Sequence, residues 1–263
     1  MKNAGRLTTA AIVLPPLIAY IYFLPPFPFF LALLAAVNIL ALREFYIMYK
    51  VPDKLYIPGL LTGCVLFYIS CRHPAYFPDG IFISLFLLLV IRLFLWKAPS
   101  GCMSEIGPLG VGFFYVSFLS FQWFLRGEPS GLAYIFMLYA SVWLADSLAY
   151  YIGKHFGKHK LYPAISPKKT IEGAFACVLG GAVGAVIIKL FFGLHIFTIP
   201  GAAAAGALLG IASMTGDLIE SMFKRDAGVK DSGSLIPGHG GILDKIDGFL
   251  IAGPVLYILL RII

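Results

Sequence analysis

Long hydrophobic runs alternate with short polar, Pro- or Gly-containing segments along almost the whole chain. A helix that crosses the hydrocarbon core of a bilayer needs about 20 apolar residues. The runs therefore predict nine membrane-spanning helices, near residues 7–24, 27–49, 55–71, 79–97, 105–125, 130–152, 171–193, 196–222 and 246–262. We interpret the first run as a retained helix, because Pro25-Pro26 and a second apolar run follow it without a small-residue cleavage site.

The basic residues support this count and give an orientation. With the N-terminus in the cytoplasm and alternating sides, 16 of the 20 Lys and Arg residues fall on the cytoplasmic side and 4 on the other. Short cytoplasmic loops of membrane proteins carry such an excess of Lys and Arg. The pattern therefore predicts an all-α integral membrane protein whose N-terminus is cytoplasmic and whose C-terminus lies on the opposite side.

The composition excludes an ordinary soluble protein. It also affects how the positive net charge is interpreted. The chain is 60% hydrophobic and 13% charged, against about 25% charged in soluble domains. The net charge of +7 follows mostly from membrane topology, so we expect no nucleic-acid partner. The four cysteines have no ligand-like spacing, and we interpret them as small hydrophobic residues. We expect one membrane domain, with scaffold helices in residues 1–130 and the catalytic core in residues 131–263.

Acidic residues gather near the C-terminus, where the hydropathy pattern also changes. Six acids lie within 31 positions: Asp217, Glu220, Asp226, Asp231, Asp244 and Asp247. An acid at the bilayer centre costs roughly 2.5–3.5 kcal/mol, so such a cluster needs a reason. Asp217 and Asp244 each have a second acid three residues later, which puts each pair on one helix face. The pairs predict a Mg²⁺ site; the alternative is salt bridging between helix ends.

The loop between the acid pairs is rich in glycine and flanked by basic residues. It contains Gly233, Pro237, Gly238, His239, Gly240 and Gly241, and the basic residues are Lys224, Arg225, Lys230 and Lys245. Glycines let backbone N–H groups approach phosphate oxygens closely. Cations, metal-binding carboxylates and a tight backbone cradle are the parts that phosphoryl and nucleotidyl transfer need. The alternative for the loop alone is a flexible turn.

A second polar group of residues lies in the middle of the chain. Asp146 sits inside the predicted span 130–152, where an acid is a functional candidate. The alternative is a buried carboxylate that accepts hydrogen bonds from its neighbours. The segment SPKKTIEG, residues 166–173, then leads into the next span, and its Pro and Thr suit a turn entering a helix. His155 and His159 have no third ligand nearby and are interpreted as solvated loop residues.

Two segments together resemble the signature of the phosphatidate cytidylyltransferases, or CDP-diacylglycerol synthases. They read SMFKRDAGVKD over residues 221–231 and PGHGGILDKID over residues 237–247. Asp146 with Ala149-Tyr150, and the segment SPKKTIEG, are similar to the same family. The resemblance covers residues 140–263; the first 130 residues match mainly in hydropathy and length, with Glu44 as one candidate family position. One departure is Lys245, where the family usually has Arg, which loses bidentate phosphate binding but keeps the charge.

The resemblance implies that CTP and phosphatidic acid condense to CDP-diacylglycerol and pyrophosphate with Mg²⁺, alone or together with a second cation. The implied metal ligands are Asp217 and Asp244, with Asp146, Asp231 and Asp247 as further ligands. The residues implied to take part in catalysis are Asp217, Asp244, Asp247, Lys224 and Asp231. The implied substrate contacts are Lys224, Arg225, Lys230, His239, Gly240, Gly241, Lys245, Ser166, Lys169, Thr170 and Ser221. We expect a homodimer in the bacterial inner membrane with its active site facing the cytoplasm.

Other functions account for part of these features. A CTP-dependent lipid kinase of the polyprenol type is the nearest alternative, since Lys245 weakens the match slightly. A transporter fits the spans and Asp146 but leaves the acidic cluster and the basic glycine loop unexplained. An intramembrane aspartyl protease could use Asp146 and Asp217, yet the segment from Lys224 to Asp247 would have no role. A CDP-alcohol phosphotransferase would need a single aspartate-rich helix, which the sequence lacks.

Overall fold

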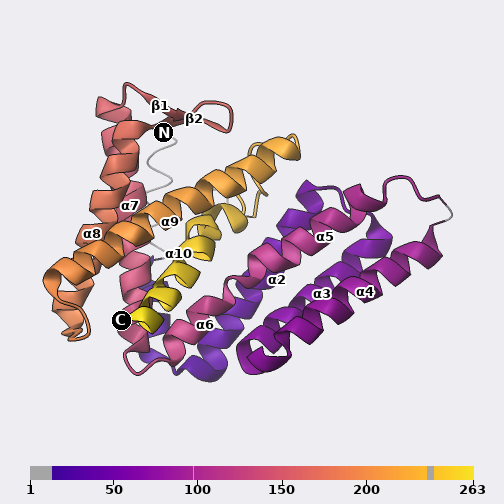
Figure 1. Cartoon of the computed structure of the whole chain (residues 1–263), viewed down its shortest axis with the longest axis horizontal. Coiled ribbons are helices and arrows are strands. Elements are labelled where there is room, and N and C mark those ends of the chain that lie inside the picture. The colour runs from indigo at the N-terminus through magenta and orange to yellow at the C-terminus, as the bar shows by residue number, and fades with distance from the viewer. Residues whose placement is uncertain (1–13, 97, 236–239) are drawn as a thin grey trace. The chain divides into compact units, whose positions relative to one another are not determined.

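The computed structural model describes residues 14–96, 98–235 and 240–263, and most of them are helical (Figure 1). After a first short helix, Leu14–Phe23, a π-helical segment Pro26–Phe30 leads into α2. The remaining helices are α2 Leu31–Met48, α3 Asp53–Arg72, α4 Phe77–Leu95, α5 Cys102–Ser117, α6 Ser120–Gly127, α7 Gly131–Phe156, α8 Ile171–Phe192, α9 Ile199–Asp226 and α10 Leu243–Ile262. A short 3-10 turn, Pro74–Tyr76, precedes α4. The strands β1 Lys160–Tyr162 and β2 Ser166–Thr170 lie between α7 and α8.

Seven helical stretches of the described chain are long and apolar enough to cross a membrane. They are Pro26–Met48, Asp53–Arg72, Pro74–Leu95, Cys102–Gly127, Gly131–Phe156, Ile171–Phe192 and Ile199–Asp226. Each coincides with one of the second to eighth runs predicted from the sequence. The protein is therefore a helical integral membrane protein.

The first and the last of the nine predicted spans are not among these seven stretches. The first, 7–24, falls partly outside the described residues, where only the short apolar helix Leu14–Phe23 is seen. The last, 246–262, lies within α10, which is not one of the seven because it carries Asp244, Lys245, Asp247 and Arg261 in 20 residues. The count of nine spans stays a prediction.

The chain divides into two compact units. Unit 1 holds the described residues up to Trp123 together with Asp231–Asp244, and unit 2 holds Phe124–Lys230 together with Lys245–Ile263. The polar C-terminal segment is thus shared: the glycine-rich loop belongs to unit 1, and most of α10 belongs to unit 2. The expected division near residue 130 stays a prediction.

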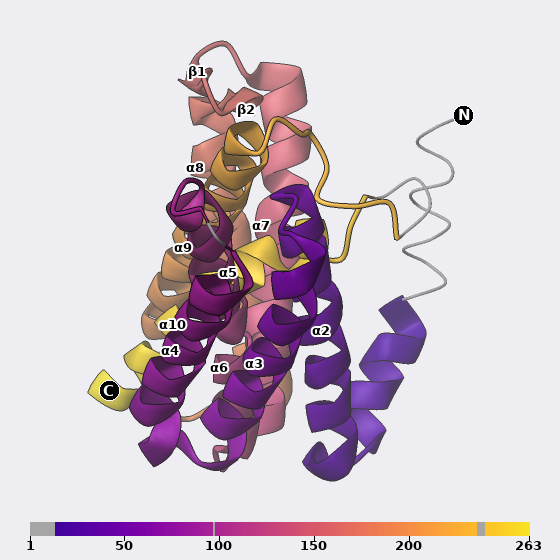
Figure 2. The same ribbon diagram turned by 90° about the vertical axis from the view of Figure 1, so that its right-hand side faces the viewer.

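In unit 1, α3 packs against α2, α4 and α5 (Figure 2). Gly59 and Gly63 of α3 and Gly112 of α5 face large side chains at these contacts, including the buried Tyr46 of α2. A buried ion pair between Arg92 and Glu105 joins α4 to α5. The same guanidinium donates to the carbonyl oxygens of Ala98 (3.3 Å) and Ser100 (3.0 Å), which ties these two residues to α4.

In unit 2, α8 packs along both α7 and α9, and β1 and β2 lie at one end of the α7–α8 pair (Figure 1). Glycines let the backbone of α8 approach those of α7 and α9 closely. Gly180 and Gly184 of α8 face the backbone of α7 at Leu144 and Ala140, and Gly181 faces Gly206 of α9. Small residues serve this purpose in membrane helix packing, because apolar side chains gain little by leaving lipid for another helix.

The strands form the part of the described chain that the all-helical prediction did not include. They pair antiparallel, with Lys160 opposite Thr170 and Tyr162 opposite Ser166. Thr170 ends β2 and caps α8, since its hydroxyl oxygen accepts a hydrogen bond from the Gly173 N–H at 3.1 Å. The predicted helix start after Thr170 is confirmed, but the residues before it form strand β2 and not the expected turn.

Gly→Ala within a helix usually stabilises it, but the close contacts of Gly206 predict a loss of stability there. We expect Gly206→Ala to lower the free energy of unfolding by about 1–3 kcal/mol, because the new methyl group would overlap the Gly181 carbonyl and Ala185. Gly110→Ala in α5 is the matched control, since no atom lies within 4 Å of the added carbon. It should be neutral or stabilising by up to about 1 kcal/mol. Unfolding in detergent micelles measures both, and equal effects would contradict the packing argument.

Candidate active site

Three aspartates of unit 2 come from three different helices and interact electrostatically. Asp146 lies on α7, Asp217 on α9 and Asp247 on α10, and Asp217 influences both of the others. Helices α9 and α10 can approach because Gly216 lies against the Asp247 carbonyl and Gly248 lies against Ser213. The same Ser213 donates a hydrogen bond from its hydroxyl to Asp146 Oδ1 at 3.3 Å. The structure therefore brings together three carboxylates that the sequence predicted as metal ligands.

Lys169 is the cation of this group. Its Nζ atom lies 2.9 Å from Asp217 Oδ2 and donates a hydrogen bond to the Met214 carbonyl oxygen at 3.3 Å. The other carboxylate oxygen of Asp217 accepts a hydrogen bond from the Ser221 hydroxyl at 3.2 Å. Lys169 and Ser221 were predicted as substrate contacts, and both are placed directly on a predicted metal ligand.

Two of the three carboxylates, those of Asp146 and Asp217, remain accessible in spite of their position on apolar helices. The Asp217 side chain is 43% exposed and Lys169 is 20% exposed, and Asp146 is exposed as well. Ionised groups that face hydrocarbon are costly. This face of unit 2 must therefore meet water, a polar ligand or another polar part of the protein.

The donor set suits Mg²⁺, although the described residues contain no group of three or more His, Cys, Asp or Glu side chains arranged to hold a metal. Mg²⁺ takes oxygen ligands and usually binds through one or two carboxylates, water and substrate phosphates. Asp146, Asp217 and Asp247 offer carboxylate oxygens, and Asp217 already binds the ammonium of Lys169. The oxygen donors present are thus of the kind that Mg²⁺ takes, and metal binding by them stays a prediction.

A buried ion pair on α9 was missed by the sequence analysis. Glu220 is fully buried, and its carboxylate pairs with Lys224, which is 8% exposed. The signal was present in the sequence, because residues four apart face each other on a helix. The family resemblance implies that Lys224 contacts the substrate; that contact stays a prediction, and the structure adds a buried carboxylate partner.

Other predicted substrate contacts bind the backbone of unit 2. Arg225 donates to the carbonyl oxygens of Ile165 (3.2 Å) and Val229 (3.1 Å), which ties the end of α9 to the β1–β2 hairpin. Thr170 caps α8, and Ser166 opens β2. His159, interpreted as a solvated residue, is exposed but also lies 2.7 Å from Glu172 through its Nδ1 atom. Direct substrate contacts by these residues stay predictions.

In unit 1, Ser232 and Gly241 donate hydrogen bonds to Asp244. Asp244 Oδ2 accepts hydrogen bonds from Gly241 N (2.8 Å), Ser232 N (3.1 Å) and Ser232 Oγ (2.9 Å). Gly240 has a φ of 87°, a left-handed conformation that favours glycine. These are the contacts of a helix-capping carboxylate, so a metal role for Asp244 stays a prediction.

The remaining predicted residues have fewer described contacts. Lys230, Asp231 and Lys245 are exposed. His239 lies outside the described residues.

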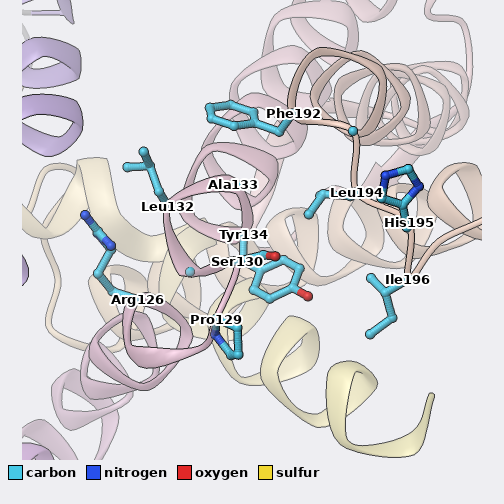
Figure 3. A pocket seen from close by; sticks show the side chains of 12 residues that line it. Arg126, Pro129, Ser130, Leu132, Ala133, Tyr134, Phe192, Leu194, His195 and Ile196 are labelled. Carbon is cyan, nitrogen blue, oxygen red and sulfur yellow. The ribbon is translucent and has the colours of Figure 1, made fainter.

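A cavity of about 380 Å³ lies elsewhere in unit 2, between the α6–α7 and α8–α9 connections (Figure 3). Arg126, Tyr134 and His195 are among its lining residues. These connections lie at the ends of α7 and α8 opposite to the β1–β2 hairpin. None of the predicted site residues lines this cavity, so it does not coincide with the carboxylate group.

Comparison with known proteins identifies the family. A profile described as the Cytidylyltransferase family matches residues 4–263. The chain belongs to this family. A phosphatidate cytidylyltransferase of Staphylococcus epidermidis is 36% identical over 271 residues, covering 99% of this chain and 98% of that protein. Proteins with the same name from Staphylococcus haemolyticus and Staphylococcus aureus are each 41% identical over 60% of this chain and 58% of their own.

The family membership confirms the resemblance drawn from the two C-terminal signature segments. It also extends that resemblance, because the match includes the N-terminal helices. From the sequence, mainly hydropathy and length related those helices to the family, with Glu44 as one candidate position.

The buried pair on α9 predicts a non-additive effect on stability. Lys224→Met should lower the free energy of unfolding by about 3–5 kcal/mol, because it leaves the fully buried Glu220 without this partner. Adding Glu220→Gln should restore most of that loss. Unfolding of both single variants and the double variant in detergent gives the coupling free energy. Additive losses would show that the pair does not act as a unit.

Proposed function

We propose that the protein is a phosphatidate cytidylyltransferase, which condenses CTP with phosphatidic acid to give CDP-diacylglycerol and pyrophosphate. The observation that carries this proposal is the family match over residues 4–263, with a relative of that name aligned along 99% of the chain. The accessible carboxylates of unit 2 support it. A nucleotidyl transfer between two anionic substrates needs metal-binding carboxylates and cations, and Asp217 with Lys169 supplies both kinds of group.

The reaction forms one P–O bond and breaks another. A phosphate oxygen of phosphatidate attacks the α-phosphorus of CTP in line, and pyrophosphate leaves with the electron pair of the broken bond. Phosphatidate is already ionised near neutral pH, so little general-base help is needed. Positioning and charge neutralisation then supply most of the rate acceleration.

We assign the metal-binding role in unit 2 to Asp217, with Asp146 and Asp247 beside it. When bound, Mg²⁺ would neutralise phosphate charge and orient the pyrophosphate leaving group. Lys169 adds a positive charge next to Asp217, and Ser221 holds the Asp217 carboxylate in its orientation. From unit 1, Asp244 and Asp231 are kept as predicted ligands. His239, Gly240 and Gly241 are kept as predicted phosphate contacts, as are Lys224, Arg225, Lys230 and Lys245.

The cellular setting follows from the sequence pattern and the bacterial relatives. We place the protein in the bacterial inner membrane with nine spans, a cytoplasmic N-terminus and an active site that faces the cytoplasm. The excess of Lys and Arg on one side supports this orientation. A homodimer is part of the same proposal.

Pyrophosphate release tests the reaction. Purified protein in detergent with phosphatidate, CTP and Mg²⁺ should release pyrophosphate, and omission of any one component should abolish release. Asp217→Asn should reduce the rate by about 100-fold or more, because it removes a metal-binding charge. Asp226→Asn, an exposed acid at the end of the same helix, is the control and should retain the wild-type rate.

The products distinguish the proposed function from its alternatives. A CTP-dependent lipid kinase would release CDP and transfer a single phosphate to the lipid. Formation of CDP in place of pyrophosphate would therefore overturn the assignment, and uptake into sealed vesicles without CTP would indicate a transporter.

Replacing Lys245 by Arg, the usual family residue, is predicted to improve the binding of CTP. Lys245→Arg should lower the KM for CTP by roughly 3- to 10-fold, because a guanidinium can bind a phosphate with two parallel hydrogen bonds. The kcat should change less. Steady-state kinetics at saturating phosphatidate measure both constants, and an unchanged or higher KM would remove Lys245 from the nucleotide contacts.

A further inference from the structure

Glu44 is a buried acid in unit 1, far in sequence from the polar C-terminal segment. It lies on α2 and is 4% exposed. Its Oε1 atom accepts a hydrogen bond from Ile242 N and its Oε2 atom accepts one from Leu243 N, both at 2.9 Å. Oε2 also accepts from the Ser232 hydroxyl, 188 residues along the chain, at 3.2 Å. A single carboxylate thus holds both ends of the glycine-rich loop.

The Glu44 and Asp244 carboxylates accept hydrogen bonds from neighbouring donors, one of which they have in common. The Ser232 hydroxyl lies within hydrogen-bond distance of both, but it can donate its proton to only one at a time. Three consecutive backbone N–H groups complete the arrangement: Gly241 N binds Asp244, and the next two bind Glu44. Such a row of N–H groups at a helix start stabilises negative charge. The two acids are therefore held beside each other by a common set of donors.

The loop backbone is fitted closely around Glu44. A side-chain carbon added at Gly233 would lie 2.7 Å from Glu44 Oε1, and one added at Gly241 would overlap both Glu44 Oε2 and Ser232 Oγ. Larger residues would push the loop away from the carboxylate. The glycines at these two positions thus serve the approach of the loop to Glu44.

We propose that Glu44 is a positioning residue that acts through Asp244. It fixes the first turn of α10 and Ser232, and these groups in turn fix the Asp244 carboxylate that follows in the same turn. A buried carboxylate is stable only with several good donors, so it strongly favours one loop conformation. The inference rests on the proposed function for its effect on activity, whereas the anchoring of the loop stands on the hydrogen bonds alone.

The first measurement tests the anchoring and does not depend on activity. In Glu44→Gln, an amide group replaces one acceptor oxygen and the charge is lost. The backbone amides of residues 241–243 should then exchange hydrogen about 10-fold or more faster than in the wild type. Glu105→Gln is the matched control, because it breaks a carboxylate ion pair of unit 1 between α4 and α5. It should leave exchange at residues 241–243 unchanged.

The second measurement tests the effect on the site. Glu44→Gln should raise the Mg²⁺ concentration for half-maximal pyrophosphate release by about 10-fold or more, with the KM for phosphatidate changed less than about 2-fold. Ser232→Ala removes only the shared hydroxyl, keeps both carboxylates, and should change exchange and Mg²⁺ dependence in the same direction. It replaces Glu44→Gln if that variant fails to fold.

The outcomes separate this inference from the proposed function. A wild-type protein without pyrophosphate release would contradict the proposed function, while the exchange measurement would still decide the anchoring. Unchanged exchange in Glu44→Gln would overturn the anchoring. Faster exchange with unaltered Mg²⁺ dependence would overturn the positioning role, as would equal changes in the Glu105→Gln control.

Discussion

An ionised carboxylate among apolar helices is stable only where cations or hydrogen-bond donors surround it. This requirement organises both units. Unit 1 contains the Arg92–Glu105 pair between α4 and α5. Unit 2 contains Lys169–Asp217 between β2 and α9 and Glu220–Lys224 within α9. Glu44 relies instead on backbone N–H groups and a serine hydroxyl. The positions of the acids thus depend on the elements that carry their partners.

Close helix packing is the second condition for the carboxylate group of unit 2. Gly180, Gly181 and Gly184 let α8 lie against the backbones of α7 and α9, and Gly216 lets α9 approach α10 at Asp247. Bulky residues at these positions would separate the helices that carry Asp146, Asp217 and Asp247. The glycines therefore contribute to the site although they contact no substrate in the proposed reaction.

The sequence predicted most of the fold and the chemical type of the site, but few of its contacts. Hydropathy is a local property, so the second to eighth spans were located within a few residues. Contacts between distant segments leave no local pattern: nothing near Glu44 indicates a loop 188 residues later, and nothing near Lys169 indicates Asp217. The family resemblance implied that Arg225 contacts the substrate, whereas the structure shows it bound to two carbonyl oxygens. The Glu220–Lys224 pair had a local signal, the spacing of four, but the sequence analysis related Glu220 only to Asp217.

The central claim is that the carboxylate group at Asp217 binds a divalent cation for cytidylyl transfer. Electron paramagnetic resonance of Mn²⁺ tests it most directly, with the purified protein and a non-reacting CTP analogue present. The account predicts a protein-bound Mn²⁺ signal that Mg²⁺ displaces and that is lost in Asp217→Asn while the variant remains folded. Equal Mn²⁺ binding by the wild type and the Asp217→Asn variant would contradict it.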